Sequence, residues 1–260
     1  MIARVLAVAG SDSGGGAGIQ ADIRAITALG GFALTAVTAV TAQDTLGVHA
    51  VHPVPAAFVA EQIRVVLADL GADAVKCGML GDAATVAAVA ALLAQWPALP
   101  LVLDPVLRAT SGAALLAGEP RAALAPLLAR AALVTPNLAE AAALSGLVVA
   151  DVAAMVRAGQ AIRAMGAAAV LVKGGHLAGE RLTDVLVDAE GVATFAGGRI
   201  ATRHLHGTGC TLAAAITTHL ARGQPLRTAV AAGRDYLRAA ILAAPGLGAG
   251  QGPVGTPWQA

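Results

Sequence analysis

Short apolar runs alternate with longer amphipathic segments along most of the chain. The short runs are rich in Val, Leu and Ala and end near Gly, Pro or a charged residue, which is typical of buried strands. They predict strands over residues 4–9, 32–41, 48–54, 72–76, 101–104, 133–135, 170–173, 182–187 and 192–195. The longer segments repeat apolar residues at helical spacing and predict helices over 19–29, 55–70, 82–95 and 121–130, with others beginning at Asn137, Asp151, Cys210 and Leu226.

The order of these elements favours an α/β fold with a mostly parallel central sheet and helices on both faces. The strands over 182–187 and 192–195 are an exception, because Glu190-Gly191 between them predicts a hairpin. We find no internal repeat and no linker between domains. We therefore expect a single domain over residues 1–260, with a loop or tail from 245 to 257.

Polar residues with useful chemistry follow several of the predicted strands. Gln43, Lys76, Asp104 and Lys173 stand at such positions, as does the loop that begins at Gly10. In open parallel sheets, ligands bind beyond the carboxyl ends of the strands. We therefore expect these residues to converge on one edge of the sheet.

Composition narrows the classes of partner. A net charge of +1 and an aromatic content of 2% argue against nucleic-acid binding. No apolar run reaches the roughly 18–20 residues that span a bilayer, and the first residues lack the layout of a signal peptide. We therefore expect a cytoplasmic protein that binds no membrane. The two cysteines, Cys77 and Cys210, do not make a disulfide framework.

The stretch from His206 to Thr211 reads His-Gly-Thr-Gly-Cys-Thr and leads into an apolar helical pattern. Backbone amides at such a helix N-terminus bind phosphate, and the helix dipole should favour the thiolate of Cys210. A phosphate site beside a candidate base predicts phosphoryl transfer. Zinc on His204, His206 and Cys210 is a weaker alternative, because a fourth ligand is missing.

A second glycine-rich stretch, residues 10–22, follows the first predicted strand and opens a helix. It lacks the lysine of a Walker A loop. It matches the permissive dinucleotide fingerprint through Gly16, Gly18 and Ala21, with Asp44 downstream, which keeps a nicotinamide-dependent oxidoreductase open as an alternative function. The other readings are a tight turn, or a loop whose backbone approaches a small flat substrate closely.

Lys76 and Lys173 are the only lysines in a chain that otherwise uses arginine, and both follow short apolar runs. An ammonium is a compact point charge, unlike a guanidinium fork. Two interpretations stay open: the two lysines occur at these positions by chance, or both positions require a point charge.

Seven separated blocks, taken together, resemble a known family. They are 10–22, 40–45, 76–80, 104–106, 135–140, 172–176 and 206–211, in the family's order. The chain resembles the hydroxymethylpyrimidine/phosphomethylpyrimidine kinases, the thiamine-pathway members of the ribokinase superfamily. It departs from the family at Cys77, usually Ile, at Leu107, often Met, and at Gln251, which stands where the family has His in a Gly-His-Gly motif.

The resemblance implies a ribokinase-like fold and ATP-dependent phosphorylation of 4-amino-5-hydroxymethyl-2-methylpyrimidine, and then of its monophosphate to the diphosphate. It implies that Cys210 is the base or proton relay. The amides of Gly207, Thr208, Gly209 and Cys210 would hold the γ-phosphoryl group, with Thr208 part of the ATP site. Lys173 would reach the ATP phosphates as a mobile positive charge.

The resemblance also implies that Asn137 and Glu140, helped by Asp104, order Mg²⁺ and its waters near the phosphates. The same Asn-x-x-Glu spacing is nearly a capping box at a helix start, so the residues alone leave both interpretations open.

For the substrate, we expect Gln43 to read the aminopyrimidine edge, since its amide carries a donor and an acceptor side by side. Gly10, Asp22 and Met79 are further candidates for the substrate pocket, although Met79 also suits a core position. Pyridoxal or pyridoxine kinase is the nearest alternative within the superfamily. Relatives imply a homodimer, and the apolar edge over 48–54 is compatible with one.

Overall fold

The computed structural model describes residues 2–108, 112–175, 177 and 179–258. Within these residues the strands form one nine-stranded sheet in the order β3-β2-β1-β4-β5-β6-β7-β8-β9. The strands are β1 (Arg4–Asp12), β2 (Phe32–Gln43), β3 (Val48–Pro53), β4 (Ala74–Cys77), β5 (Leu101–Leu103), β6 (Leu133–Val134), β7 (Val170–Val172), β8 (Arg181–Asp188) and β9 (Gly191–Gly198). The six strands from β2 to β7 in this order are parallel, whereas β3, β8 and β9 pair antiparallel at the two edges. The prediction of a mostly parallel sheet is confirmed.

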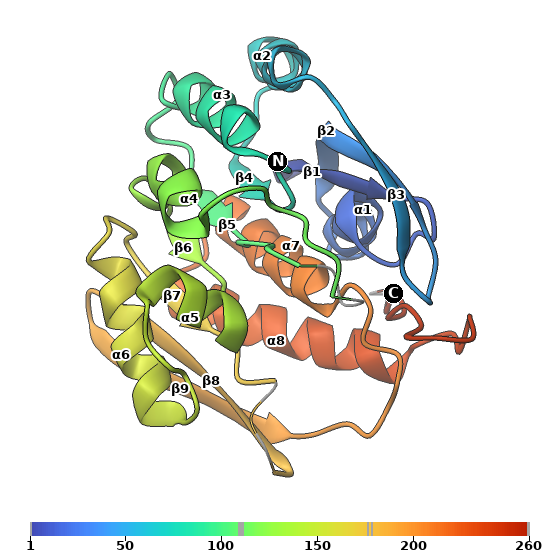
Figure 1. The fold of residues 1–260 in the computed structure, drawn as a ribbon, viewed down its shortest axis with the longest axis vertical. Coiled ribbons are helices and arrows are strands. Elements are labelled where there is room, and N and C mark those ends of the chain that lie inside the picture. Colours follow the sequence, from blue (N-terminus) through green and yellow to red (C-terminus); the bar gives the residue numbers. More distant parts are fainter. Residues whose placement is uncertain (1, 109–111, 176, 178, 259–260) are drawn as a thin grey trace.

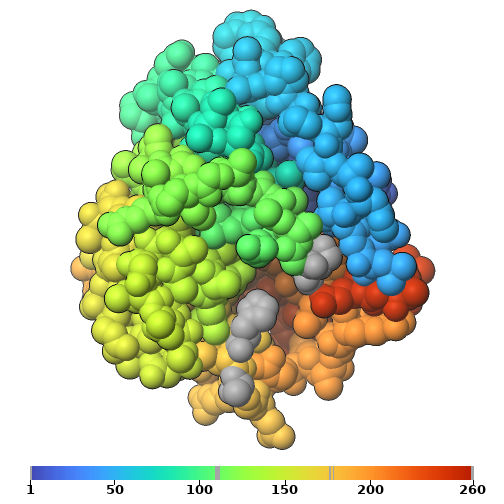
Figure 2. Space-filling model, in the orientation of Figure 1, coloured from blue at the N-terminus to red at the C-terminus, as the bar shows by residue number. Residues whose placement is uncertain are grey.

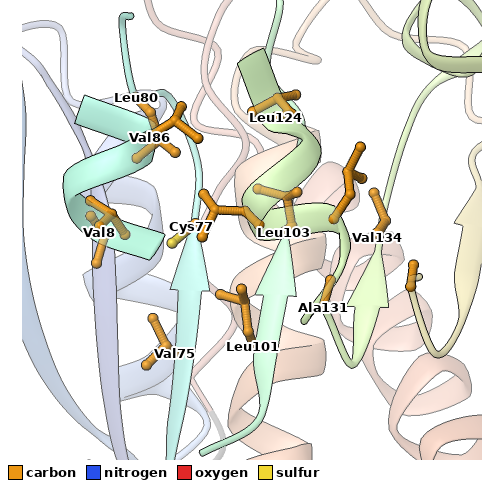
Figure 3. Close-up of a cluster of buried hydrophobic side chains, with 14 of the residues drawn as sticks. Val8, Val75, Cys77, Leu80, Val86, Leu101, Leu103, Leu124, Ala131 and Val134 are labelled. Carbon is orange, nitrogen blue, oxygen red and sulfur yellow. The ribbon is translucent and has the colours of Figure 1, made fainter. Parts of the chain in front are cut away.

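Helices cover both faces of the sheet (Figure 1). They are α1 (Gly18–Ala28), α2 (Ala56–Asp69), α3 (Ala83–Leu93), α4 (Pro120–Leu128), α5 (Leu138–Ser145), α6 (Val152–Arg163), α7 (Thr208–Ala221) and α8 (Leu226–Leu242). Strand alternation divides the core between the faces. Val8, Cys77 and Leu103 point toward α3 and α4 (Figure 3), whereas Ala7 packs with α1 and α7.

Local capping explains where several helices begin. Asp82 and Asp151 accept hydrogen bonds from the amides of Thr85 and Ala154, at the third residue of α3 and of α6. The hairpin predicted at Glu190-Gly191 joins β8 to β9, with Gly191 at φ 110°. Helix α7 begins at Thr208, two residues before the expected start. Its N-cap, Gly207, has a left-handed backbone conformation with φ 82°, which glycine adopts readily.

The segment after α8 is a loop, as the sequence suggests, and it packs against the rest of the protein. Gly255 donates its amide to Ala240 in α8, and the His206 backbone pairs with Pro253. The two amides at Gly250 and Gln251 bond to Thr45 at the tip of the β2–β3 hairpin. The end of the chain therefore ties the turn before α7 to that hairpin. None of the helices described is long and apolar enough to cross a bilayer.

Candidate active site

The carboxyl ends of the central strands meet the first turn of α7, as the strand pattern predicts. Lys173, directly after β7, places Nζ 2.9 Å from Oδ1 of Asp104, directly after β5. The Thr135 hydroxyl, after β6, donates to the same oxygen at 3.0 Å. A Cβ atom at Gly209 would lie 3.3 Å from Lys173 Nζ and 3.4 Å from Asp104 Oδ2. The backbone of α7 therefore faces a buried ion pair at close range.

The first turn of α7 offers open amides. Its N-cap, Gly207, supplies no side chain, and Thr208 N makes a long bond of 3.3 Å to the Leu205 carbonyl. Within the part of the chain that the structure describes, the amides of Gly209 and Cys210 have no hydrogen-bond acceptor. Figure 2 shows a recess on this face, and α7 lies behind it in the same view of Figure 1. An anion that enters it would meet these amides and the positive end of the helix dipole.

The Cys210 thiol is half-buried in this turn. Burial raises its pKa to about 11, with Lys76 acting in the opposite direction and the carboxylates of Asp22 and Asp104 adding to the rise. Lys76 favours the thiolate, but burial disfavours it more strongly, so the pKa of the thiol is raised overall. The expected effect of the helix dipole stays a prediction.

The charged side chains of Asp104, Glu140 and Lys173 behind this turn alter one another's pKa. Burial disfavours ionisation of Asp104, but Lys173 and Lys76 outweigh burial and lower its pKa. Burial raises the pKa of Glu140 to about 7, with Lys173 opposing the rise and Asp104 adding to it. Lys173 thus stands between two carboxylates, of which Asp104 is the better ionised.

Asn137 and Glu140 form a complete capping box at the start of α5. Asn137 Oδ1 accepts from the Glu140 amide at 2.9 Å, and Glu140 Oε2 accepts from the Asn137 amide at 2.7 Å. The capping interpretation is therefore confirmed, and it fixes both residues beside Lys173, whose backbone bridges to Asn137. In the described residues no group of three or more His, Cys, Asp or Glu side chains is arranged to hold a metal.

The glycine-rich loop after β1 is closed on itself by Asp12. Asp12 Oδ1 accepts from Gly14 N at 2.8 Å, and Oδ2 accepts from Gly16 N at 2.9 Å and Ala17 N at 2.8 Å. Burial opposes the charge of Asp12, but His206 and these amides outweigh it and lower the Asp12 pKa. The amides that a dinucleotide phosphate would need are already occupied, which argues against the oxidoreductase alternative.

Gln43 lies between this loop and the turn before α7. His206 Nε2 is 2.8 Å from Asp12 Oδ2 and 3.3 Å from the Gln43 side-chain amide, whose other end is 3.3 Å from Thr41 Oγ1. The carboxylate of Asp12 only accepts, so His206 carries its proton on Nε2 and donates it. We therefore orient the Gln43 side chain so that its oxygen accepts from His206 Nε2–H and its nitrogen donates to Thr41 Oγ1. A cavity of about 190 Å³ adjoins this amide and is lined by residues 43–47, His206, Gly250 and Gln251.

Comparison with known proteins places the chain in a family. Residues 12–255 match the model of the phosphomethylpyrimidine kinase family. The chain belongs to this family. It is 51% identical over 258 residues to the hydroxymethylpyrimidine/phosphomethylpyrimidine kinase of Rhizobium meliloti (strain 1021), covering 98% of this chain and 97% of that one. The Haemophilus influenzae protein of the same name is 43% identical, over 97% and 96% of the two chains.

Solved structures agree on the fold. A Bacillus subtilis pyridoxal kinase in complex with ADP superposes with a TM-score of 0.92 at 34% identity, covering 99% of this chain and 98% of that one. A phosphomethylpyrimidine kinase from Clostridium difficile 630 superposes with a TM-score of 0.81 at 37% identity, covering 92% of this chain and 99% of that one. The chain is thus a kinase with the ribokinase-like fold of these proteins.

In this member of the phosphomethylpyrimidine kinase family, the expected substrate residues differ in their surroundings. Gly10 adjoins Met79, since a Cβ at Gly10 would lie 2.9 Å from Met79 Sδ, and Met79 is half-buried rather than in the core. Asp22 is fully buried and paired with Lys76, and its expected role as a substrate contact stays a prediction.

The alternative of a zinc site also finds no support, because Asp12 engages His206 and the described residues hold no such cluster.

Two functional features escaped the sequence analysis. The first is Asp12, which organises the front loop. An Asp two residues before glycines is a known signal for an Asx turn and could have identified it. The second is the contact between Gln43 and His206, which are 163 residues apart in sequence and share no local pattern.

Proposed function

We propose that the chain transfers the γ-phosphoryl group of ATP to the hydroxymethyl oxygen of 4-amino-5-hydroxymethyl-2-methylpyrimidine, and then phosphorylates the monophosphate to the diphosphate. The observation that carries this proposal is the first turn of α7, which presents the Cys210 thiol, and amides that are open within the described residues, opposite Lys173. The names of relatives at 42–51% identity support the substrate class. Staphylococcus aureus pyridoxal kinase, 32% identical, has been solved with ADP and with AMP-PCP, which supports ATP as the donor.

We propose a role for each residue at this turn. The amides of Gly207, Thr208, Gly209 and Cys210 would stabilise charge on the transferred phosphoryl group. Lys173 would leave its partner Asp104 and follow the phosphates with its mobile ammonium. Cys210 would act from its thiolate form, after its thiol has lost a proton to solvent. When the hydroxymethyl oxygen bonds to phosphorus and the bond to the leaving ADP oxygen breaks, the hydroxyl proton passes to this thiolate Sγ. The second reaction needs no such acceptor, because a phosphate monoester is already largely ionised at neutral pH.

We also propose that Mg²⁺ accompanies ATP, held from Asp104, Asn137 and Glu140 mostly through water. The donor set fits this ion, which prefers oxygen ligands and keeps several waters. Glu140 is buried beside Lys173 with its pKa raised, so a nearby cation would favour its ionised form. Bound Mg²⁺ would neutralise charge on the phosphates.

Gln43 is proposed to read the ring. Its amide borders the cavity of about 190 Å³ and offers one oxygen lone pair and one N–H beyond its contacts to His206 and Thr41. This pair matches a ring nitrogen beside an exocyclic amine. Pyridoxal kinase activity stays a second candidate, because pyridoxal kinases superpose closely on the chain.

We further propose a single-domain homodimer in the cytoplasm. The outer strand β3 exposes most of its residues, and Val51 on β3 and Val40 on β2 add apolar surface at the same edge. An unpaired strand edge of this kind suits pairing with a second copy.

Product analysis tests the central proposal. The protein is incubated with ATP, Mg²⁺ and the pyrimidine alcohol, with pyridoxal in a parallel reaction at the same concentration. Successive formation of the pyrimidine monophosphate and diphosphate, with one ADP for each, is the expected result. Preferred phosphorylation of pyridoxal would overturn the substrate, and release of no ADP with either alcohol would overturn the kinase chemistry.

A further inference from the structure

A buried ion pair lies next to the proposed base and takes no direct part in the chemistry described above. Lys76 Nζ lies 2.9 Å from Asp22 Oδ2, and both side chains are fully shielded from solvent. Lys76 is one of only two lysines in the chain, and it is among its largest fully buried side chains. Asp22 Oδ1 has no hydrogen-bond partner within the described residues. A buried charge pair of this kind costs desolvation energy and needs a reason.

The alternation of β4 fixes the direction of Lys76. Val75 and Cys77, on either side of it, belong to the core beneath α2, α3 and α4. Lys76 therefore points to the opposite face, where its register partner Ala7 packs with α1 and α7. The face that receives the ammonium is thus the one that carries Cys210.

Helix α1 brings its carboxylate to the same place. Helix α1 packs against α7, and the amide of Gly18, at the start of α1, lowers the pKa of Cys210. Asp22 is four residues later, so it lies on the same face of α1, one turn further along. The thiol of Cys210, the ammonium of Lys76 and the carboxylate of Asp22 consequently lie on the same face of the sheet, where α7 packs against α1 and β4.

We propose that Lys76 is a positioning residue that stabilises negative charge on Cys210 Sγ, and that Asp22 holds the ammonium in place and limits its strength. The inference deepens the proposed function, in which Cys210 accepts the substrate proton. It explains why a lysine is buried here at all. A neutral side chain would fill the space but would leave a sulfur anion without a counter-charge.

The charges around the thiol agree with this arrangement. Four charged groups act electrostatically on Cys210: Lys76 on β4, Asp22 on α1, Asp104 after β5 and Lys173 after β7. Asp104 and Lys173 pair with each other. Lys76 lowers the pKa of Cys210 and Asp22 raises it, so neutralising each in turn should have opposite effects.

The test measures alkylation of Cys210 by iodoacetamide, a neutral reagent, in the full-length enzyme without ATP or substrate. Rates are followed by mass spectrometry of the Cys210 peptide between pH 7 and 9, in the wild type, Lys76→Met and Asp22→Asn. Asp73→Asn is the matched control, because it also removes the carboxylate of an ion pair, with Arg4, at the opposite end of β4. Cys77 serves as an internal control for folding, since it is fully buried and reacts when the protein opens.

We expect Lys76→Met to slow alkylation of Cys210 by about three- to tenfold and Asp22→Asn to accelerate it by a similar factor. A change of one pKa unit alters the thiolate fraction tenfold, and the accompanying change in nucleophilicity offsets part of this. Asp73→Asn should match the wild type. Shifts of Lys76→Met and Asp22→Asn in the same direction, or rates equal to those of Asp73→Asn, would overturn the proposal.

Lys76→Met leaves Asp22 buried without its partner and could prevent folding. In that case Asp22→Asn is compared with Asp22→Asn/Lys76→Met, which buries no charge at either position. Loss of the acceleration in the double variant supports the role of Lys76, and persistence of the acceleration refutes it.

A kinetic measurement connects the pair to turnover. The pH at which kcat for the alcohol reaches half its maximum should rise in Lys76→Met and fall in Asp22→Asn, with KM for the alcohol little changed. Alkylation of the resting enzyme does not depend on any substrate. A failure of the proposed substrate therefore leaves the alkylation result intact, and the two failures can be told apart.

Discussion

Two glycine-rich turns open helices near the proposed site, yet the protein uses them in opposite ways. In the turn before α1, the carboxylate of Asp12 fills the backbone amides of Gly14, Gly16 and Ala17. In the turn before α7, no side chain caps the helix, and the amides of Gly209 and Cys210 are open within the described residues. One turn carries its own anion, and the other is ready to accept one.

The closed turn supports the open one. A Cβ at Gly207 would collide with the Gly16 carbonyl, and a Cβ at Gly16 would collide with the His206 ring. The two turns therefore pack backbone against backbone, and Asp12 joins them by its bond to His206. A glycine-rich motif before a helix indicates close backbone approach, whereas the hydrogen bonds of its amides decide whether it binds phosphate.

The largest effect should come from the open turn. Cys210→Ala should lower kcat for the alcohol by about 10² to 10⁴, the usual value of a general base, while binding of the pyrimidine largely survives. Phosphorylation of the monophosphate should fall much less, because its acceptor oxygen carries no proton to remove. Separate assays of the two steps, with binding by calorimetry, measure this contrast. Near-wild-type turnover of the alcohol would remove Cys210 from the mechanism.

Removing the internal anion should open the closed turn. Asp12→Asn should destabilise the fold by about 2–3 kcal/mol, or roughly 30- to 150-fold in the folding equilibrium, because buried amides lose a charged acceptor. The pKa of Asp12 is lowered by folding, so its stabilisation is present above its usual value of 3.8 and is lost as pH falls through the folded value. Urea unfolding should therefore show a gap between wild type and variant that is largest near pH 7 and shrinks toward pH 3. A gap that does not depend on pH would contradict this account.

Filling the open turn should cost activity without costing stability. Gly209→Ala would place a methyl group 3.3 Å from Lys173 Nζ and 3.4 Å from Asp104 Oδ2, where the phosphates are proposed to enter. We expect KM for ATP to rise by about tenfold, while the melting temperature stays level or rises, since alanine favours a helix over glycine by up to about 1 kcal/mol. Thermal unfolding and initial rates decide the outcome. An unchanged KM for ATP would place the phosphates elsewhere.

Most of the fold could be predicted from the sequence. Each expected strand and helix is present with ends shifted by a few residues, because hydrophobic period and capping residues such as Asp82 and Asp151 are local signals. The segment after α8 is the loop that its glycines suggested, but the long-range bonds to Thr45 and Ala240 that fix it in place could not be predicted.

Less of the site followed from the sequence. The strand ends correctly brought Asp104 and Lys173 together, since parallel strands share one carboxyl edge. The raised pKa of Cys210 could not be predicted, because burial depends on all the elements packed around a thiol and has no sequence pattern. The partner of Asp22 could not be predicted either, since Lys76 is 54 residues away.

The smallest effect should be at Gln43, which touches both turns. Its backbone exchanges hydrogen bonds with the Ser13 hydroxyl in the first turn, and its side chain meets His206 before the second. Gln43→Ala should raise KM for the pyrimidine alcohol by about five- to tenfold, the value of one or two neutral hydrogen bonds, and change kcat less.

A pyrimidine alcohol without the 4-amino group separates loss of ring recognition by Gln43 from general damage to the site. The wild type should bind this analogue more weakly than the natural alcohol, whereas Gln43→Ala should bind the two alike, because the amide that distinguishes them is gone. If the variant still prefers the aminopyrimidine by the wild-type factor, another group reads that edge, and the two turns hold Gln43 only as part of their scaffold.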